Sequence, residues 1–128
     1  MVDDDRFCLE LVRDLLEGED FEVLTTDNVH AGYSFIQEWQ PDLVIMDLMQ
    51  GRQPVGLDVL AAVREDPRLC DVPMIIVSAD ALRLARLAAH YCQQAEIATL
   101  GKPFDLQELI ELVQEMLSDD SPCEAVGT

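Results

Sequence analysis

Acidic side chains at two places in this chain of 128 residues have the chemistry of a cation site. Asp3 and Asp4 stand side by side near the start of the chain, and Asp47 ends the apolar run "LVIMD". Carboxylates that lie within a few ångströms raise each other's pKa unless a cation neutralises them. Because oxygen ligands that are all acidic select a hard divalent ion, these residues predict a Mg²⁺ site.

Two further side chains could act on a phosphoryl group at the same place. Ser78 follows the apolar run "MIIV", and Lys102, the only lysine, lies in "LGKPF". A carboxylate can attack phosphorus to give an acyl phosphate, and a metal ion screens the approach of the anionic group. The Ser78 hydroxyl and the Lys102 ammonium could hold the other phosphoryl oxygens. Together these residues supply the elements of phosphorylation on Asp47.

Each of these residues has an ordinary interpretation when it is taken alone. An acidic run at the start of a chain is usually a solvated end or a helix cap, and Asp5 is a candidate N-cap. Asp47 could cap a strand, Ser78 could open a turn, and Lys102 could be a surface charge. The joint presence of Asp47, Ser78 and Lys102 favours a functional role for Asp3 and Asp4 as well.

The elements that must position these residues alternate along the chain. Short apolar runs predict strands at residues 21–25, 42–47, 74–79 and 97–101. Helical periodicity predicts helices at residues 6–18, 28–39, 56–66, 80–95 and 105–117. This alternation predicts a doubly wound α/β fold with a parallel sheet. Active sites in such folds lie at the carboxyl ends of the strands, where Asp47, Ser78 and Lys102 fall.

Particular side chains receive structural roles from the same patterns. Within helix 28–39, Asp27 or Asn28 is the candidate N-cap, and the inward face holds Val29, Tyr33, Ile36 and Trp39. Asp105 is expected to cap the last helix. Asp58, Glu65, Asp66 and Asp80 are interpreted as helix caps or solvated acids.

The composition excludes several classes of protein. A formal net charge of −18 argues against binding to nucleic acid or to anionic membranes, because both are polyanions. The four cysteines are widely spaced and there are two histidines, so neither a zinc site nor a disulfide framework is expected. The absence of a signal-peptide pattern and of a long apolar run predicts a cytoplasmic protein.

Four motifs, in order and spacing, resemble the receiver domain of bacterial two-component response regulators. They are "VDDD" before an amphipathic helix, "PDLVIMDLM", "DVPMIIVSA" and "GKPF". The resemblance implies a CheY-like, flavodoxin-like fold in which five helices flank a five-stranded parallel sheet. It implies a receiver domain over residues 1–117, a polar tail over residues 118–128, and a signalling domain rather than an enzyme.

The resemblance also implies a role for each matched residue. Asp47 is the phosphoacceptor, Asp4 a direct Mg²⁺ ligand, Asp3 a ligand through water, and the Met49 main-chain carbonyl the third protein ligand. Ser78 and Lys102 match the switch hydroxyl and the lysine of the family, and the Lys102–Pro103 bond would be cis. The expected donor is a sensor histidine kinase or a histidine phosphotransfer protein, and phosphorylation would change binding to an unidentified downstream protein. A dimer is compatible with this scheme.

The sequence departs from the family first at its start. Only Met1 and Val2 precede the acids, where the family carries a strand of about five apolar residues. We therefore expect that the recorded start lies inside a longer reading frame, or that a swapped segment of a partner fills the gap.

Two later positions also differ from the family. In "LMQGRQPVG", Gln50 replaces the usual proline and Gly56 lies nine residues after Asp47, one later than usual, so Arg52 could reach over the site. Thr99 stands where the family usually has an aromatic residue that swings inward on phosphorylation. The coupling of Ser78 to that residue therefore cannot operate in the usual way.

Two other functions remain open at this point. The truncated strand and the altered loop favour a receiver-fold interaction module that is not phosphorylated. An aspartate-nucleophile phosphatase would share much of the site, but it needs a second aspartate two residues after the nucleophile, where this chain has Met49.

Overall fold

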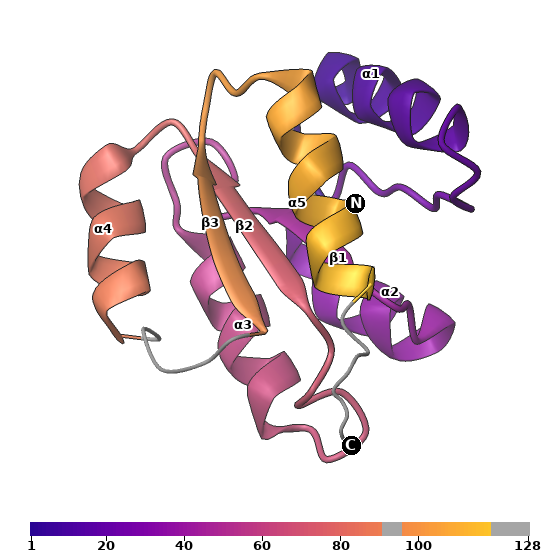
Figure 1. Ribbon diagram of the computed structural model, residues 1–128. Coiled ribbons are helices and arrows are strands. Elements are labelled where there is room, and N and C mark those ends of the chain that lie inside the picture. The colour runs from indigo at the N-terminus through magenta and orange to yellow at the C-terminus, as the bar shows by residue number, and fades with distance from the viewer. Residues whose placement is uncertain (91–95, 119–128) are drawn as a thin grey trace.

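The computed structural model describes residues 1–90 and 96–118 as a parallel sheet with helices on both faces (Figure 1). The helices are α1 (Arg6–Glu17), the 3₁₀ helix η1 (Val29–Ala31), α2 (Gly32–Trp39), α3 (Val55–Glu65), α4 (Ala81–His90) and α5 (Leu106–Ser118). The strands are β1 (Val44–Asp47), β2 (Met74–Ser78) and β3 (Ile97–Gly101). The predicted alternation of helices and strands is confirmed, and none of the described helices is both long and apolar enough to cross a membrane.

The three strands form a parallel sheet in the order β1, β2, β3. Every residue of β1 and β2 is buried, which explains why both read as continuous apolar runs rather than as alternating ones. The register places Asp47 opposite Val77 and Ser78 opposite Gly101. The carboxyl ends of the strands therefore lie at one edge of the sheet.

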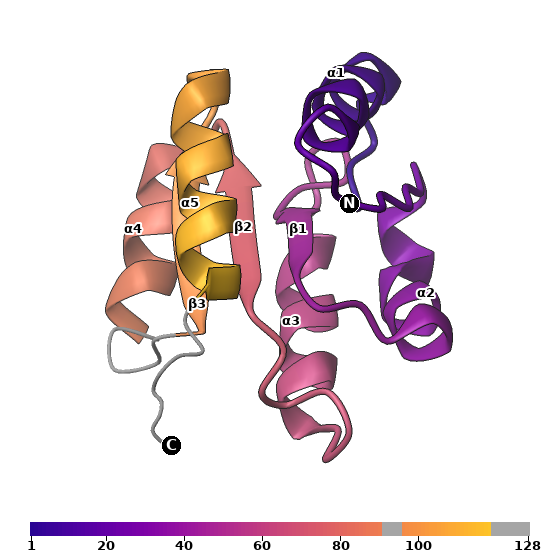
Figure 2. The same ribbon diagram turned by 45° about the vertical axis from the view of Figure 1, so that its right-hand side comes forward.

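Val2 occupies the place of a further central strand, next to β1 (Figure 2). It forms parallel bridges to Met46 on one side and to Thr26 on the other. Its N–H donates to the Ile45 carbonyl at 2.8 Å, and its carbonyl accepts from the Asp47 N–H at 2.8 Å. The order across the sheet is thus Thr26, Val2, β1, β2, β3, which is a doubly wound arrangement with its first strand reduced to one bridge.

The predicted strand at residues 21–25 is wrong. Only Thr26, the residue after this run, bridges to Val2, and residues 21–25 have no strand geometry. A strand needs a partner that satisfies its main-chain groups, and the partner of this run would be the residues before Val2. The run has the composition of a strand but lacks its neighbour.

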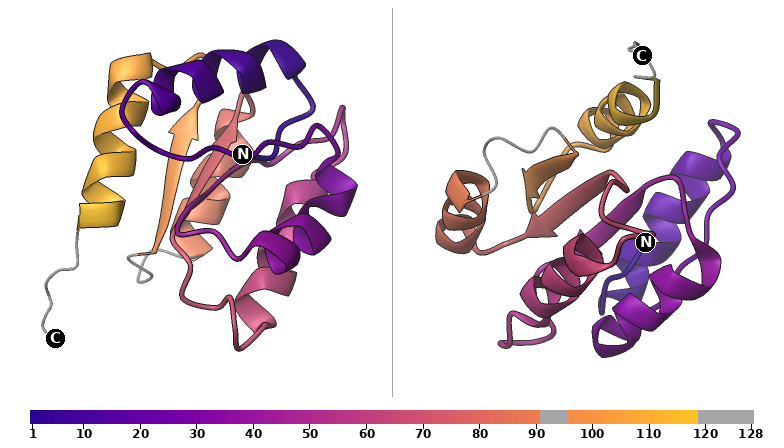
Figure 3. Two further views of the ribbon diagram at one scale, coloured as in Figure 1. Left: turned by 90° about the vertical axis from the view of Figure 1, so that its right-hand side faces the viewer. Right: turned by 90° about the horizontal axis from the view of Figure 1, so that it is seen from below.

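The helices divide between the two faces of the sheet (Figure 3). Residues of α1 and α5 pack with Ile45, Ile75 and Val77 on one face. Residues of α2, α3 and α4 pack with Val44, Met46 and Ile76 on the other. Alternate residues of each buried strand thus serve opposite cores, so the strands are held rigidly between two helical layers.

The helix ends agree with the predictions at three caps. Asp5 accepts hydrogen bonds from the main-chain N–H groups of Phe7 and Cys8 at the start of α1, and Asp105 accepts from the Gln107 N–H before α5. Asn28 caps η1, and the α-helical part of the predicted helix 28–39 begins only at Gly32. Residues 91–95 of the predicted fourth helix lie outside the described residues.

Two of the structural roles predicted for side chains are wrong. Trp39 is 51% exposed, although Val29 and Ile36 of the same segment are buried as expected. It ends α2 and lies on the wall of a cavity beside Met1, where the missing strand would give it a packing surface. Asp66 is not a solvated acid, because it is buried and accepts a hydrogen bond from the Tyr33 hydroxyl at 2.9 Å.

Candidate functional site

Four separate elements bring the predicted residues to one edge of the sheet. Asp47 is the last residue of β1, and Ser78 is the last residue of β2. Lys102 follows β3, and its N–H donates to the Ser78 carbonyl at 2.9 Å. Asp3 follows Val2 and reaches the same edge because the bridge to Met46 fixes the register of Val2 against β1.

The ammonium of Lys102 joins two of the carboxylates. Its Nζ donates to Asp3 Oδ2 at 2.7 Å and to Asp47 Oδ2 at 3.1 Å. Its side chain is 20% exposed, so these ion pairs lie largely out of solvent. Burial acts to lower the pKa of Lys102, but hydrogen bonds and attraction from the two carboxylates outweigh it, and the pKa is raised.

Both carboxylates that contact Lys102 are buried and held by main-chain donors. Asp3 has no exposed side-chain surface and accepts from the Asp5 N–H at 2.9 Å. Asp47 accepts from the Met49 N–H at 3.0 Å. Burial, assisted by the charge of Asp3, raises the pKa of Asp47, while the Met49 N–H and Lys102 act in the opposite direction. The Asp47 carboxylate is therefore poorly solvated but fixed in direction.

Asp4 completes a group with the composition of a divalent-cation site. One carboxylate oxygen from each of Asp3, Asp4 and Asp47 lies within 4.8 Å of the other two. Three carboxylates against the single ammonium of Lys102 leave two negative charges without a partner in the cluster. Oxygen ligands and this excess charge fit Mg²⁺, which binds through a small number of carboxylates and keeps several waters.

The remaining predicted residues lie beside this group without a recorded contact to it. Ser78 is buried, and its Oγ accepts from the Asp80 N–H at 3.0 Å. Met49 touches Asp47 through its N–H, while no bond of its carbonyl is found among the described residues. The Lys102–Pro103 bond is cis, as expected.

The altered loop after Asp47 forms a turn that the sequence reasoning missed. Gln50 and Gln53 bond to each other through both main-chain pairs, at 2.8 and 3.0 Å, and Gly51 between them has a φ of +60°. The Gly51 N–H donates to Asp4 Oδ2 at 3.0 Å, so the turn reaches the acidic cluster. The pair Gln50-Gly51 was the available signal, since glycine readily adopts a positive φ.

Two neighbouring positions define how this loop fits. The expectation that Arg52 reaches over the site is not met, because Arg52 is exposed and forms no ion pair within the described part of the chain. Gly56 packs against the end of β1, where an added Cβ would lie 2.5 Å from the Asp47 carbonyl oxygen. The turn at residues 50–53 thus accommodates the extra residue while Gly56 keeps a close approach that only glycine permits.

Comparisons with known proteins agree with this arrangement. The family model of the response regulator receiver domain matches residues 1–114. The polar-differentiation response regulator DivK of Brucella anthropi is 30% identical over 121 residues, which cover 93% of this chain and 94% of that protein.

Solved structures show the same fold. A response regulator receiver domain protein from Clostridium thermocellum is 26% identical with a TM-score of 0.74, over 91% of this chain and 90% of that one. The chemotaxis protein CheY4 of Vibrio cholerae has a TM-score of 0.76 over 91% of this chain and 94% of that one. At 21% identity, that second likeness concerns the fold alone.

Proposed function

The chain belongs to the response regulator receiver domain family, and on this basis we propose that Asp47 accepts a phosphoryl group from a phosphohistidine. The observation that carries the proposal is the contact of the single lysine with both Asp3 and Asp47, inside a cluster of three carboxylates. A structural salt bridge needs one acid for one base, whereas this group keeps an excess of buried negative charge.

The residues of the chain supply the nucleophile and its orientation. An Asp47 Oδ atom forms a bond to phosphorus while the P–N bond of the phosphohistidine breaks, and the electron pair of that bond stays on the imidazole nitrogen, which takes a proton from solvent. The Met49 N–H holds one Asp47 oxygen, so the carboxylate keeps a fixed direction. Lys102 keeps the carboxylate ionised and, with Ser78, lies at the edge where phosphoryl oxygens would need donors.

The chemistry of the donor set also supports a cation. Asp3, Asp4, Asp47 and the Met49 carbonyl would hold Mg²⁺, whose charge would offset the repulsion between the acids and the incoming phosphoryl group. Asp3 is already bonded to Lys102 and to the Asp5 N–H, which agrees with a ligand that acts through water rather than directly.

The phosphoryl donor we propose is a sensor histidine kinase or a histidine phosphotransfer protein, with a downstream protein that senses the phosphorylated state. The domain would comprise residues 1–117, in agreement with the match over residues 1–114, and residues 118–128 would form a tail. Residues 119–128 lie outside the described part of the chain. In this scheme the chain assists its own phosphorylation and dephosphorylation but turns over no other substrate.

The test is direct phosphorylation in solution. Incubation with acetyl phosphate and Mg²⁺ should add one phosphoryl group, detected as a mass increase of the intact protein. The adduct should be absent from Asp47→Asn and retained in Asp14→Asn, which changes the net charge equally at an exposed acid on α1. A wild-type protein that gains no adduct contradicts the proposal.

The same measurement decides the second candidate, a receiver-fold interaction module that is not phosphorylated. The reduced first strand and the bond from Gly51 to Asp4 favour it, because both could weaken the cation site. Such a module would bind its partner equally well before and after treatment with acetyl phosphate.

A further inference from the structure

An apolar cavity lies where the sheet lacks a strand. Its volume is about 300 Å³, and it runs along β1 beside Met1. The segment from Phe21 to Leu24 forms the opposite wall. Openings of this size are rare in domains of this kind, whose interiors are packed with few voids larger than a water molecule. The cavity therefore marks a place where the chain has a binding surface without its occupant.

The walls of the cavity are apolar on both sides of the sheet plane. On one side lie Leu16 of α1 with Val113 and Leu117 of α5. On the other side lie Phe35, Ile36 and Trp39 of α2. Since successive side chains of a strand point to opposite faces, an occupant in strand geometry would bury all of them in apolar surroundings. The walls thus select a continuous apolar run rather than an alternating one.

The main chain at the cavity has the spacing of a parallel ladder that stops too early. The Thr26 N–H donates to the Met1 carbonyl at 3.0 Å, and the Asp3 N–H donates to the Thr26 carbonyl at 3.2 Å. The amino group of Met1 donates to the Leu24 carbonyl at 2.6 Å, where the next peptide N–H of the ladder would lie. The terminal ammonium thus stands in for a peptide group at the mouth of the cavity.

The neighbouring strand offers unused groups in the same register. The Ile45 carbonyl accepts from Val2, so the Ile45 N–H points to the same side, because both main-chain groups of a strand residue share a direction. Continuing the ladder by one residue before Met1 would satisfy the Ile45 N–H and the Leu43 carbonyl. A second added residue would accept from the Leu24 N–H.

We infer that this cavity is the binding site of an extended apolar segment of four or five residues, joined by a peptide bond to the nitrogen of Met1 and parallel to β1. The covalent link follows from the geometry. Met1 to Asp3 already hold the next positions of the same strand, so a separate parallel peptide would have to end with its carboxylate against the amino group of Met1. A chain passing through from another molecule would collide with Met1.

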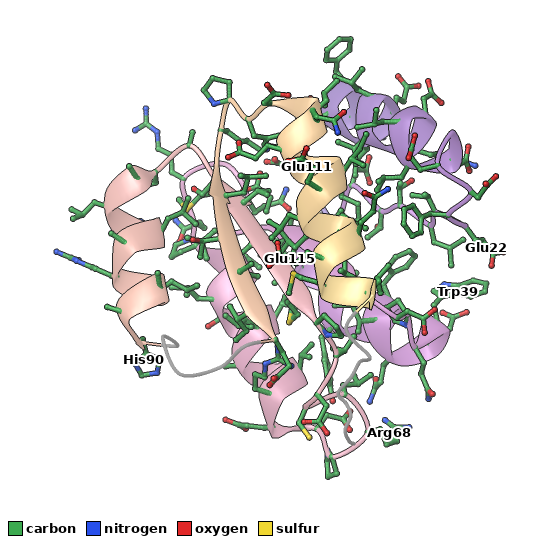
Figure 4. The ribbon with its side chains drawn as sticks, in the orientation of Figure 1. Glu22, Trp39, Arg68, His90, Glu111 and Glu115 are labelled. Carbon is green, nitrogen blue, oxygen red and sulfur yellow. The ribbon has the colours of Figure 1, made fainter. Side chains whose placement is uncertain are left out.

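Charge also disfavours the free amino group at this position. Burial lowers the pKa of the Met1 ammonium to about 6, because the apolar surroundings oppose its charged form. A peptide bond at the same atom keeps the hydrogen bond to Leu24 and removes the charge. Glu22 and Trp39, which both line the cavity, come from the segment after α1 and from the end of α2 (Figure 4).

The experiment compares three forms of the chain: as it stands, with Val-Ile-Leu-Ile-Val inserted directly before Met1, and with Ser-Asn-Gly-Ser-Asn at the same place. The apolar extension should raise Tm by about 5 °C or more relative to the polar one. It should also slow hydrogen exchange of the Ile45 and Leu24 amides by about tenfold or more. A three-residue Val-Ile-Val extension should protect the same two amides, and it replaces the longer one should that variant aggregate.

Three results would overturn the inference. Equal Tm and equal amide exchange in the apolar and polar variants would show that the cavity does not bind the extension. A dimer of the unextended chain that already protects the Ile45 amide would assign the cavity to a second copy. Equal protection by an equimolar, capped Val-Ile-Leu-Ile-Val peptide would show that no covalent link is needed.

Discussion

At the scale of single residues, Lys102 holds together a site that would otherwise repel itself. It contacts Asp3 and Asp47, which are both buried and come from parts of the chain far apart in sequence. An isolated buried carboxylate is strongly unfavourable, so each acid depends on the ammonium or on a bound cation. The lone lysine of an acidic chain therefore stabilises the fold and serves the phosphoryl chemistry at the same atom.

Replacing Lys102 with methionine should lower the free energy of unfolding. Breaking a buried pair typically costs about 3–5 kcal/mol, and because Lys102 is 20% exposed we expect about 2–4 kcal/mol without Mg²⁺. Added Mg²⁺ should recover part of this loss, since it supplies positive charge to the same acids. Urea denaturation with and without MgCl₂ measures both effects.

The control for this substitution is Arg83→Ala. Arg83 pairs with Asp80 at 3.0 Å, but both side chains are about 40% exposed, so we expect a loss of about 0.5 kcal/mol or less. A similar small loss for both variants would mean that Lys102 does not compensate the buried acids.

Much of the site could be predicted from the sequence, because strand ends fix positions. Asp47 and Ser78 follow apolar runs, and parallel strands bring such ends to one edge, so their neighbourhood followed from the pattern of elements. The contact from Gly51 to Asp4 could not be predicted in this way, since it depends on the path of a turn with an extra residue. The burial of Asp66 likewise depends on Tyr33 of α2, a partner distant in sequence.

At the scale of elements, the sheet shows which predictions depend on a neighbour. The runs that became β1 and β2 pair with another strand along their length, and both were predicted. The run at residues 21–25 has similar composition but only Val2 to pair with, at the bridge to Thr26, and it stays without strand geometry. Strand propensity is therefore a statement about a surface that a partner must complete.

The contact between β1 and the start of α3 predicts a strict requirement for glycine at position 56. A Cβ on Gly56 would lie 2.5 Å from the Asp47 carbonyl oxygen and 2.7 Å from Leu48 Cα, and both are main-chain atoms that cannot rotate away. Gly56→Ala should therefore lower stability by about 1–3 kcal/mol and slow phosphorylation by displacing Asp47.

Gly101→Ala at the end of β3 is the matched substitution, because nothing lies within 4 Å of its added Cβ. We expect a change of about 0.5 kcal/mol or less for this variant. Thermal denaturation and adduct formation with acetyl phosphate should separate the two glycines. Equal behaviour of both variants would contradict the close approach of α3 to β1.

The turn after α3 predicts a pH dependence that involves Asp66. The main-chain N–H and the guanidinium of Arg68, together with the Tyr33 hydroxyl, hold the pKa of Asp66 at about 2. Because the folded-state pKa lies below the ordinary value of 3.8, the ionised form adds stability above pH 3.8, and this contribution disappears as the pH falls through 2.

Asp66→Asn should therefore be less stable than the wild type at pH 7, and the difference should shrink between pH 4 and pH 2. Urea denaturation across this range measures the difference. Asp71→Asn, at an exposed acid of the following loop, should show no comparable change with pH. A constant difference for Asp66→Asn at all pH values would mean that its charge is not the stabilising feature.

At the scale of the whole molecule, charge and topology act on the same edge of the sheet. A formal net charge of −18 at pH 7 opposes compaction, and the topology concentrates Asp3, Asp4 and Asp47 at one place. The receiver fold tolerates this because two helical layers hold the strands from both faces. Stability and cation binding are therefore linked, and the protein should respond to Mg²⁺ more strongly than to salt in general.

This linkage predicts a specific stabilisation by Mg²⁺. A cation that binds only the folded state adds about 2.7 kcal/mol to the free energy of unfolding when its concentration is one hundred times its Kd. NaCl of equal ionic strength screens the net charge of the molecule but does not occupy the cluster, so its effect should be smaller. Asp4→Asn should lose the difference between the two salts, whereas Asp14→Asn, with the same net charge, should keep it. A full Mg²⁺ response in Asp4→Asn would remove Asp4 from the ligand set, because general screening would then explain the stabilisation.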